Sequence, residues 1–74
     1  MTKNIRIQNL KCPKCSAKIQ AAIAQLDGVK SVDIDFDAKI MKLDVAEEKY
    51  PQLKAVMLNI AKRVEPNAIM EEID

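Results

Sequence analysis

Residues 32–45 read VDIDFDAKIMKLDV, and this stretch decides the fold. Apolar residues alternate with polar ones on both sides of a short connection: Val32, Ile34 and Phe36 before it, and Met41, Leu43 and Val45 after it. Alternation with a period of two is typical of strands that bury one face. The stretch therefore predicts a β-hairpin whose turn is centred on Asp37-Ala38.

The register of this hairpin follows from its apolar pattern. A turn at that point pairs three positions across the two strands: Val32 with Leu43, Asp33 with Lys42, and Ile34 with Met41. Apolar side chains then meet on one face of the hairpin, and an acid meets a base on the other.

A strand and a helix are predicted before the hairpin. Residues 4–8 alternate as a strand does, and Leu10 is expected to turn inward from the loop that follows. Apolar residues then recur at helical spacing: Cys15, Ile19, Ala22, Ile23 and Leu26. We expect this helix to end at Asp27-Gly28, because Gly28 suits the left-handed closing position.

A second helix and a final strand are predicted after the hairpin. Pro51 opens the helix and Pro66 ends it, because the residue before a proline avoids helical angles. The apolar stripe of this helix comprises Leu53, Val56, Met57, Ile60, Ala61 and Val64. A short strand is expected at 68–73. The order βαββαβ predicts an α+β fold, with a four-stranded antiparallel sheet and both helices on one face.

Length, charge and composition narrow the possible functions. The 74 residues predict one domain over 1–74, and a formal net charge of +1 argues against nucleic-acid binding. No apolar run approaches the roughly 18 to 20 residues that span a bilayer, and no signal-peptide stretch is evident. We therefore expect a cytoplasmic protein without membrane insertion. The chain has no histidine, which removes the commonest metal ligand and the commonest general base.

The segment Cys12-Pro13-Lys14-Cys15 stands where the first strand turns into the first helix. The free N–H groups and the positive dipole end of a helix stabilise negative charge there, so thiol pKa values fall. Two thiolates at this spacing can converge on one soft metal ion. Lys11, Lys14 and Lys18 crowd the same end, where they favour an anionic dithiolate complex of Cu(I) and docking on an acidic partner.

Two plainer interpretations remain beside this one. Cysteines also serve as small buried hydrophobic residues, and lysines often line a solvated helix face.

Glu65 is a candidate third ligand, because its connection is expected near the cysteine loop. A carboxylate ligand favours Zn(II) or Cd(II) over Cu(I), which prefers sulfur. The alternative for Glu65 is an ordinary charged residue at a helix end.

The sequence resembles the heavy-metal-associated domain family over nearly its whole length. The resemblance rests on the run from Leu10 to Cys15 and on Ile19, Leu26-Asp27-Gly28-Val29 and Val32. The family pattern is Met-x-Cys-x-x-Cys, a helix, Leu-x-Gly-Val-x-x-Val and a hairpin. It implies a ferredoxin-like fold, with Cys12 and Cys15 as metal ligands and Leu10 at a buried position where Met is usual.

Members of this family are soluble metallochaperones or N-terminal modules of metal-pumping P-type ATPases. The resemblance therefore implies metal transfer to such an ATPase or its other domains, by a chain that is monomeric without metal. The metal itself stays open. Val64-Glu65-Pro66 is similar to the end of cadmium-pump modules, where an acidic residue can join the site. Lys11, however, stands where zinc and cadmium modules often have Asp.

Two functions compete at this stage. The first is a non-enzymatic carrier of one Cu(I), Zn(II) or Cd(II) ion, because a two-thiolate site is left open to ligands from a partner. The second is a glutaredoxin-like dithiol oxidoreductase, which also uses Cys-Pro-x-Cys at a strand-to-helix turn. Element order argues against the enzyme, because the hairpin follows the first helix directly. Neither Pro51 nor Pro66 suits the extended proline that such enzymes set opposite the disulfide.

Overall fold

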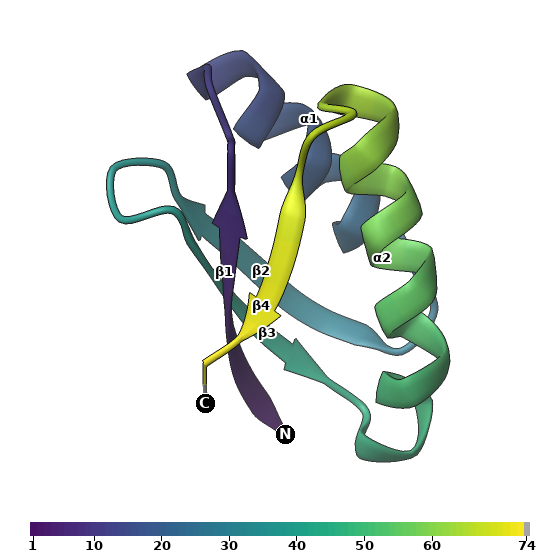
Figure 1. Ribbon diagram of the computed structural model, residues 1–74. Helices are drawn as coiled ribbons and strands as arrows, with labels where there is room; N and C mark the ends of the chain where they lie inside the picture. The colour runs from purple at the N-terminus through teal and green to yellow at the C-terminus, as the bar shows by residue number, and fades with distance from the viewer. Residues whose placement is uncertain (74) are drawn as a thin grey trace.

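Four strands form one antiparallel sheet, and two α-helices complete a βαββαβ chain (Figure 1). The computed structural model describes residues 1–73. The elements are β1 (Thr2–Gln8), α1 (Pro13–Ala24), β2 (Val29–Asp35), β3 (Ile40–Val45), a 3₁₀ turn η1 (Glu47–Lys49), α2 (Tyr50–Val64) and β4 (Ile69–Glu72). The strand order is β2-β3-β1-β4, so β1 and β3 lie at the centre. This confirms the ferredoxin-like prediction.

The hairpin of β2 and β3 has the predicted register. Val32 lies opposite Leu43, Asp33 opposite Lys42 and Ile34 opposite Met41. The connection spans residues 36–39, so Phe36 belongs to the turn and not to the strand. An Asp35 carboxylate oxygen accepts a 3.2 Å hydrogen bond from the Ala38 backbone, and Lys39 takes a φ of 61°. An Asp-Ala pair alone favours a turn only weakly. The hydrogen bond to the Asp35 side chain therefore helps to stabilise this turn.

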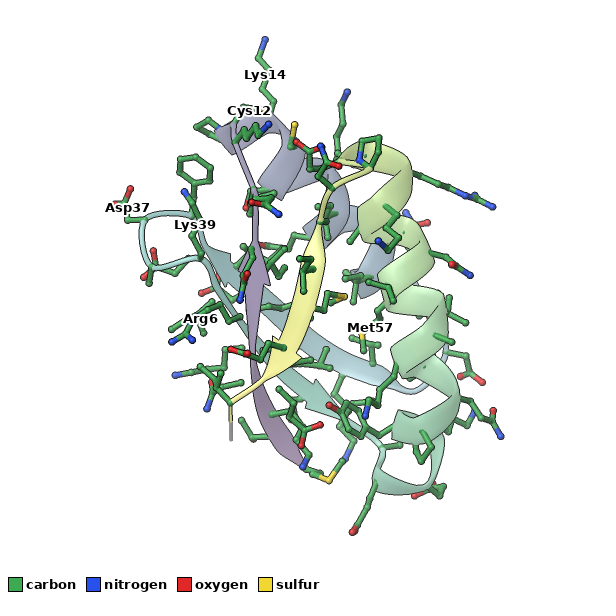
Figure 2. The ribbon with its side chains drawn as sticks, in the orientation of Figure 1. Arg6, Cys12, Lys14, Asp37, Lys39 and Met57 are labelled. Carbon is green, nitrogen blue, oxygen red and sulfur yellow. The ribbon has the colours of Figure 1, made fainter. Side chains whose placement is uncertain are left out.

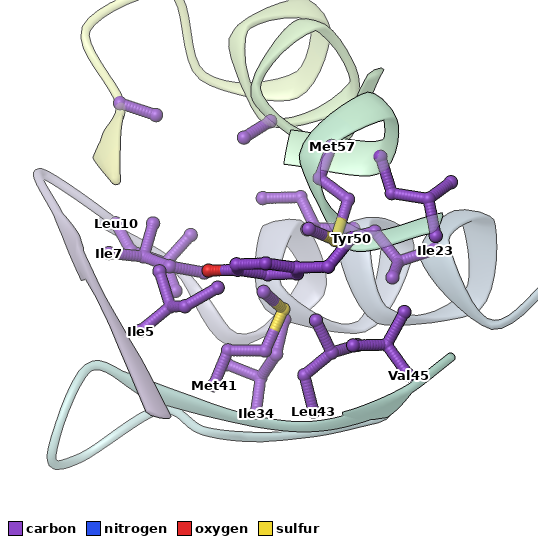
Figure 3. Close-up of a cluster of buried hydrophobic side chains, with 14 residues drawn as sticks. Ile5, Ile7, Leu10, Ile23, Ile34, Met41, Leu43, Val45, Tyr50 and Met57 are labelled. Atoms are coloured by element: carbon purple, nitrogen blue, oxygen red, sulfur yellow. The ribbon is translucent and has the colours of Figure 1, made fainter. Parts of the chain in front are cut away.

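One face of the sheet carries the core. Met41, Leu43 and Val45 of β3 point from the sheet toward the helices, where Figure 3 shows Met57 and Tyr50 above them. Ile5 and Ile7 of the central strand β1 join the same cluster, and so do Ile19 and Ile23 of α1. The prediction of two helices on one face is therefore confirmed. Leu10 is also buried, as expected, with 2% of its surface exposed.

The predicted stripe of α2 is wrong at Val56. Leu53, Met57 and Ala61 are buried, but Val56 is 41% exposed. The buried line along α2 is centred on residues spaced by four, and Val56 lies on its flank. Tyr50 extends the line at the start of the helix, where it is 7% exposed.

The first helix ends earlier than predicted, at Ala24. The next residues turn with hydrogen bonds from Gln25 to the Ala22 carbonyl and from Leu26 to the Ile23 carbonyl. Gly28 does have a positive φ of 102°, but it closes the approach to β2 and does not cap the helix. A Cβ atom at this position would lie 2.7 Å from Cδ of Lys49, so the Lys49 side chain would have to shift, and the positive φ would be strained for any other residue.

The remaining boundaries differ by a few residues. β1 begins at Thr2, and β4 covers only Ile69–Glu72 of the predicted 68–73. Pro51 lies in the first turn of α2, and the helix ends at Val64, as the two prolines predicted. Within residues 1–73, neither α-helix is long and apolar enough to cross a membrane.

Candidate metal centre

The two cysteines flank the first turn of α1. Cys12 is the N-cap residue, with extended backbone angles of φ −144° and ψ 150°, and Pro13 occupies the first helical turn. Proline fits there because its missing N–H would find no partner inside the helix anyway. Cys15 is on the first turn, so the helix start brings both thiols to one end of the molecule. Both thiols are free and half-buried.

The sulfur of Cys12 caps the helix. It accepts a 3.2 Å hydrogen bond from the backbone N–H of Cys15, while the carbonyl of Cys12 accepts one from Ser16. The capping position is normally taken by an oxygen from Ser, Thr, Asp or Asn, and here the sulfur of Cys12 accepts from a free N–H group in its place. A negative charge on Cys12 is therefore stabilised by the backbone itself.

The thiols have unequal acidities. The hydrogen bond from the Cys15 side chain, followed by that from the Cys15 backbone, lowers the pKa of Cys12 below its ordinary value. The same side-chain contact raises the pKa of Cys15, and desolvation and the negative charge of Cys12 raise it further. The two thiols therefore titrate as an interacting pair, in which Cys12 ionises before Cys15.

Positive charge surrounds this site. Lys18 lowers the pKa of both cysteines through its charge. Lys11 and Lys14 are exposed, and Figure 2 shows Lys14 beside Cys12 and extended away from the fold. The three predicted lysines therefore lie on one end of the molecule with the cysteines.

Glu65 lies close enough to Cys15 for its charge to act on the thiol, but its carboxylate does not group with the two sulfurs as a third ligand. It follows the last residue of α2, in the loop that Figure 1 shows at the same end as the start of α1. Its negative charge contributes to the raised pKa of Cys15. Its carboxylate accepts a 3.2 Å hydrogen bond from the backbone of Asn67. Among residues 1–73, no three Cys, Asp or Glu side chains group closely enough to hold a metal ion.

Two residues at this end were not predicted. Ser16 is 5% exposed beneath the first turn of α1, although its polarity gave no sign of burial. Asn9 has a φ of 69°, and its side chain reaches the backbone of Asn67. The only sequence signal for Asn9 is its residue type, because asparagine tolerates left-handed angles better than most residues.

Known proteins with similar sequences handle copper. The profile of the heavy-metal-associated domain matches residues 4–73. The copper chaperone CopZ of Staphylococcus saprophyticus subsp. saprophyticus is 31% identical over 55 residues, which cover 72% of this chain and 81% of that protein. CopZ of Staphylococcus haemolyticus is 29% identical over 49 residues, covering 66% and 72%.

Solved structures with the same fold include a domain of a copper(I) ATPase and a domain of a copper transporter. The N-terminal domain of PacS from Synechocystis PCC6803 superposes with a TM-score of 0.73 at 20% identity, over 100% of this chain and 98% of that one. The yeast copper transporter domain Ccc2a gives a TM-score of 0.75 at 15% identity, over 97% and 93%. At such identities these likenesses establish the fold alone.

Proposed function

Because the chain belongs to the heavy-metal-associated domain family, we propose that it binds one soft metal ion between Cys12 and Cys15 and passes it to a partner. The observation that carries this proposal is the capped helix start. Backbone N–H groups and Lys18 favour a thiolate at Cys12, and a thiolate is the form that binds soft metals. Cys15, on the first turn of α1, would supply the second sulfur ligand.

The cargo we propose is Cu(I). Two thiolates satisfy Cu(I), whereas Zn(II) and Cd(II) want about four ligands. Among residues 1–73, no third possible ligand groups with the two cysteines, which supports this choice. The copper chaperones to which the chain is similar support it too. Zn(II) or Cd(II) is the alternative cargo, and it requires Glu65 to leave Asn67 and join the sulfurs.

An open site allows transfer. A partner's thiolate can approach the ion while Cys12 and Cys15 still hold it, so ligands are exchanged one at a time and the free ion is never released. We propose that the partner is a metal-transporting P-type ATPase or another domain of one. The exposed lysines Lys11 and Lys14 favour a partner with acidic groups beside its own site. The single domain would do this work in the cytoplasm, where thiols stay reduced.

We propose no catalytic role for the dithiol. In the described part of the chain, Pro51 and Pro66 lie at the two ends of α2, and the hairpin follows α1 directly. Thiol–disulfide oxidoreductases of the glutaredoxin type set an extended proline opposite their reactive sulfur, where the substrate disulfide docks. Neither proline at the ends of α2 matches that arrangement. An insulin-reduction assay should accordingly read near background.

The test is metal titration of the reduced protein against competing chelators. Replacing Cys12 and Cys15 together with Ser should abolish binding of one Cu(I) per chain, with circular dichroism confirming that the fold is kept. Met70→Leu is the matched control, because it removes a sulfur from β4 and should leave Cu(I) affinity unchanged. Tight one-to-one binding by the double serine variant would overturn the proposal.

A further inference from the structure

The loop that precedes Cys12 begins with a residue in an unusual conformation. Asn9 follows β1 directly and has a φ of 69°, in the left-handed region. For most residues, this conformation raises the free energy by about 1 kcal/mol or more, and asparagine adopts it more readily than most. The backbone turns sharply here, and Leu10 is then buried while Cys12 reaches the start of α1.

The side chain of Asn9 joins this loop to a second one. Its Nδ2 donates a 2.8 Å hydrogen bond to the carbonyl of Asn67, in the connection between α2 and β4. The backbone N–H of Asn67 in turn donates to the carboxylate of Glu65 at 3.2 Å. The Ala68 N–H donates to the Glu65 carbonyl at 2.9 Å and closes the turn. One side chain thus connects the cysteine loop with the turn that holds Glu65.

We propose that Asn9 is a positioning residue that fastens the Glu65–Asn67 turn beside the cysteines. The inference rests on the proposed function, because the position matters only if the thiolates hold an ion. With the contact in place, the turn limits access to the sulfurs and keeps the Glu65 charge at a fixed distance from Cys15. Without it, the turn opens more often and the bound ion becomes more accessible to competing ligands.

Two substitutions separate the side chain of Asn9 from its backbone angle. Asn9→Gly keeps the left-handed conformation and removes the amide. Asn9→Asp keeps the shape but replaces the donor with a carboxylate, which cannot donate to a carbonyl. Asn9→Ala loses both features, so its effects alone would not distinguish strain from contact. Gln20→Ala is the control, because it removes another side-chain bond to the backbone, the 2.9 Å bond from Ile34.

The first measurement needs no metal. Amide hydrogen exchange of Asn67 and Ala68 should be about five-fold faster in Asn9→Gly and Asn9→Asp, since one exposed hydrogen bond is lost. The amides between β1 and β3 serve as the reference for global stability and should change much less. In Gln20→Ala, Ile34 should exchange faster while Asn67 and Ala68 stay as in the wild type.

The second measurement is the rate at which a chelator removes Cu(I). Both Asn9→Gly and Asn9→Asp should lose the ion about three-fold faster or more, and Gln20→Ala should not. Unchanged exchange at Asn67 and Ala68 in both variants would overturn the contact, whether or not the protein binds metal. Faster exchange with an unchanged Cu(I) loss rate would overturn the positioning role while leaving metal binding intact.

Discussion

The backbone N–H of Cys15 donates a 3.2 Å hydrogen bond to the sulfur of Cys12, so one cysteine caps the turn that carries the other. The two sulfurs therefore differ chemically before any metal arrives. Cys12 is stabilised as a thiolate, and Cys15 keeps its proton to a higher pH. Under the proposed function, Cys12 would be the sulfur that offers a thiolate at the lower pH, and Cys15 would follow.

This asymmetry predicts which thiol reacts first. In the reduced, metal-free protein, iodoacetamide should modify Cys12 faster than Cys15 between about pH 7 and 8, because the lower pKa of Cys12 leaves more of it as thiolate. A lower pKa also makes a thiolate somewhat less nucleophilic, but this effect is the smaller one near neutral pH. Peptide mass spectrometry at short times gives the order. Earlier modification of Cys15 would contradict the capping assignment.

The register of the hairpin could be predicted because its information is local. Two apolar strands with a period of two leave one register that puts apolar against apolar, and a slip by one residue would turn Val32 and Ile34 to solvent. The start of α1 within the segment Cys12–Cys15 and the end of α2 before Pro66 were also local, because proline restricts the backbone by itself.

The features that were predicted wrongly or not at all depend on distant parts of the chain. Gly28 takes its positive φ where the side chain of Lys49 packs against it, and α1 has already ended at Ala24. The exposure of Val56 follows from how α2 is rotated on the sheet, which no pattern within the helix specifies. The contact between Asn9 and Asn67 joins segments 58 positions apart. Such tertiary contacts produce no periodic pattern in the sequence from which they could be predicted.

The metal-free protein is predicted to fold cooperatively. The buried core is made of apolar side chains and includes neither Cys12 nor Cys15, so we expect it to form without a metal, unlike that of a zinc finger. Met57→Ala should cost about 2–5 kcal/mol, because Met57 is fully buried at the centre of α2. Val56→Ala, on the exposed flank of the same helix, should cost less than about 1 kcal/mol. Urea unfolding without metal measures both, and equal costs would contradict the packing described here.

The contact between Tyr50 and Glu72 predicts a pH dependence. The Tyr50 hydroxyl donates a 2.7 Å hydrogen bond to the Glu72 carboxylate, and this bond, followed by that from Lys3, lowers the pKa of Glu72. A carboxyl with a lowered folded pKa stabilises the protein above its unfolded pKa of about 4.5 and loses that contribution as the pH falls. Glu72→Gln should therefore destabilise the protein at pH 7 and much less at pH 3.

The neighbouring glutamate supplies the control for this prediction. Glu71 forms an exposed ion pair with Arg6 at 3.1 Å, and such pairs contribute little. Glu71→Gln should leave urea unfolding nearly unchanged at both pH values. If Glu72→Gln destabilises equally at pH 7 and pH 3, the loss reflects packing, and the charged hydrogen bond contributes nothing.

The proposed third ligand, Glu65, bears on whether the proposed site could hold a metal with more than two ligands. If its carboxylate leaves the Asn67 N–H and joins the thiolates, Glu65→Ala should weaken Zn(II) or Cd(II) binding about ten-fold or more, which is about 1.4 kcal/mol. Cu(I) affinity should stay nearly the same, because two thiolates already satisfy that ion. Competition titrations with all three metals on wild type and variant measure this difference.

A second glutamate separates ligation from charge. Glu47 belongs to the 3₁₀ turn before α2, at the opposite end of that helix from Glu65, so Glu47→Ala removes a negative charge without touching the site. It should leave all three affinities unchanged. Glu65→Gln adds the finer distinction, since it keeps a neutral oxygen ligand but no charge. If Glu65→Ala matches the wild type for every metal, Glu65 only holds its own turn, and the site is a two-thiolate centre suited to Cu(I).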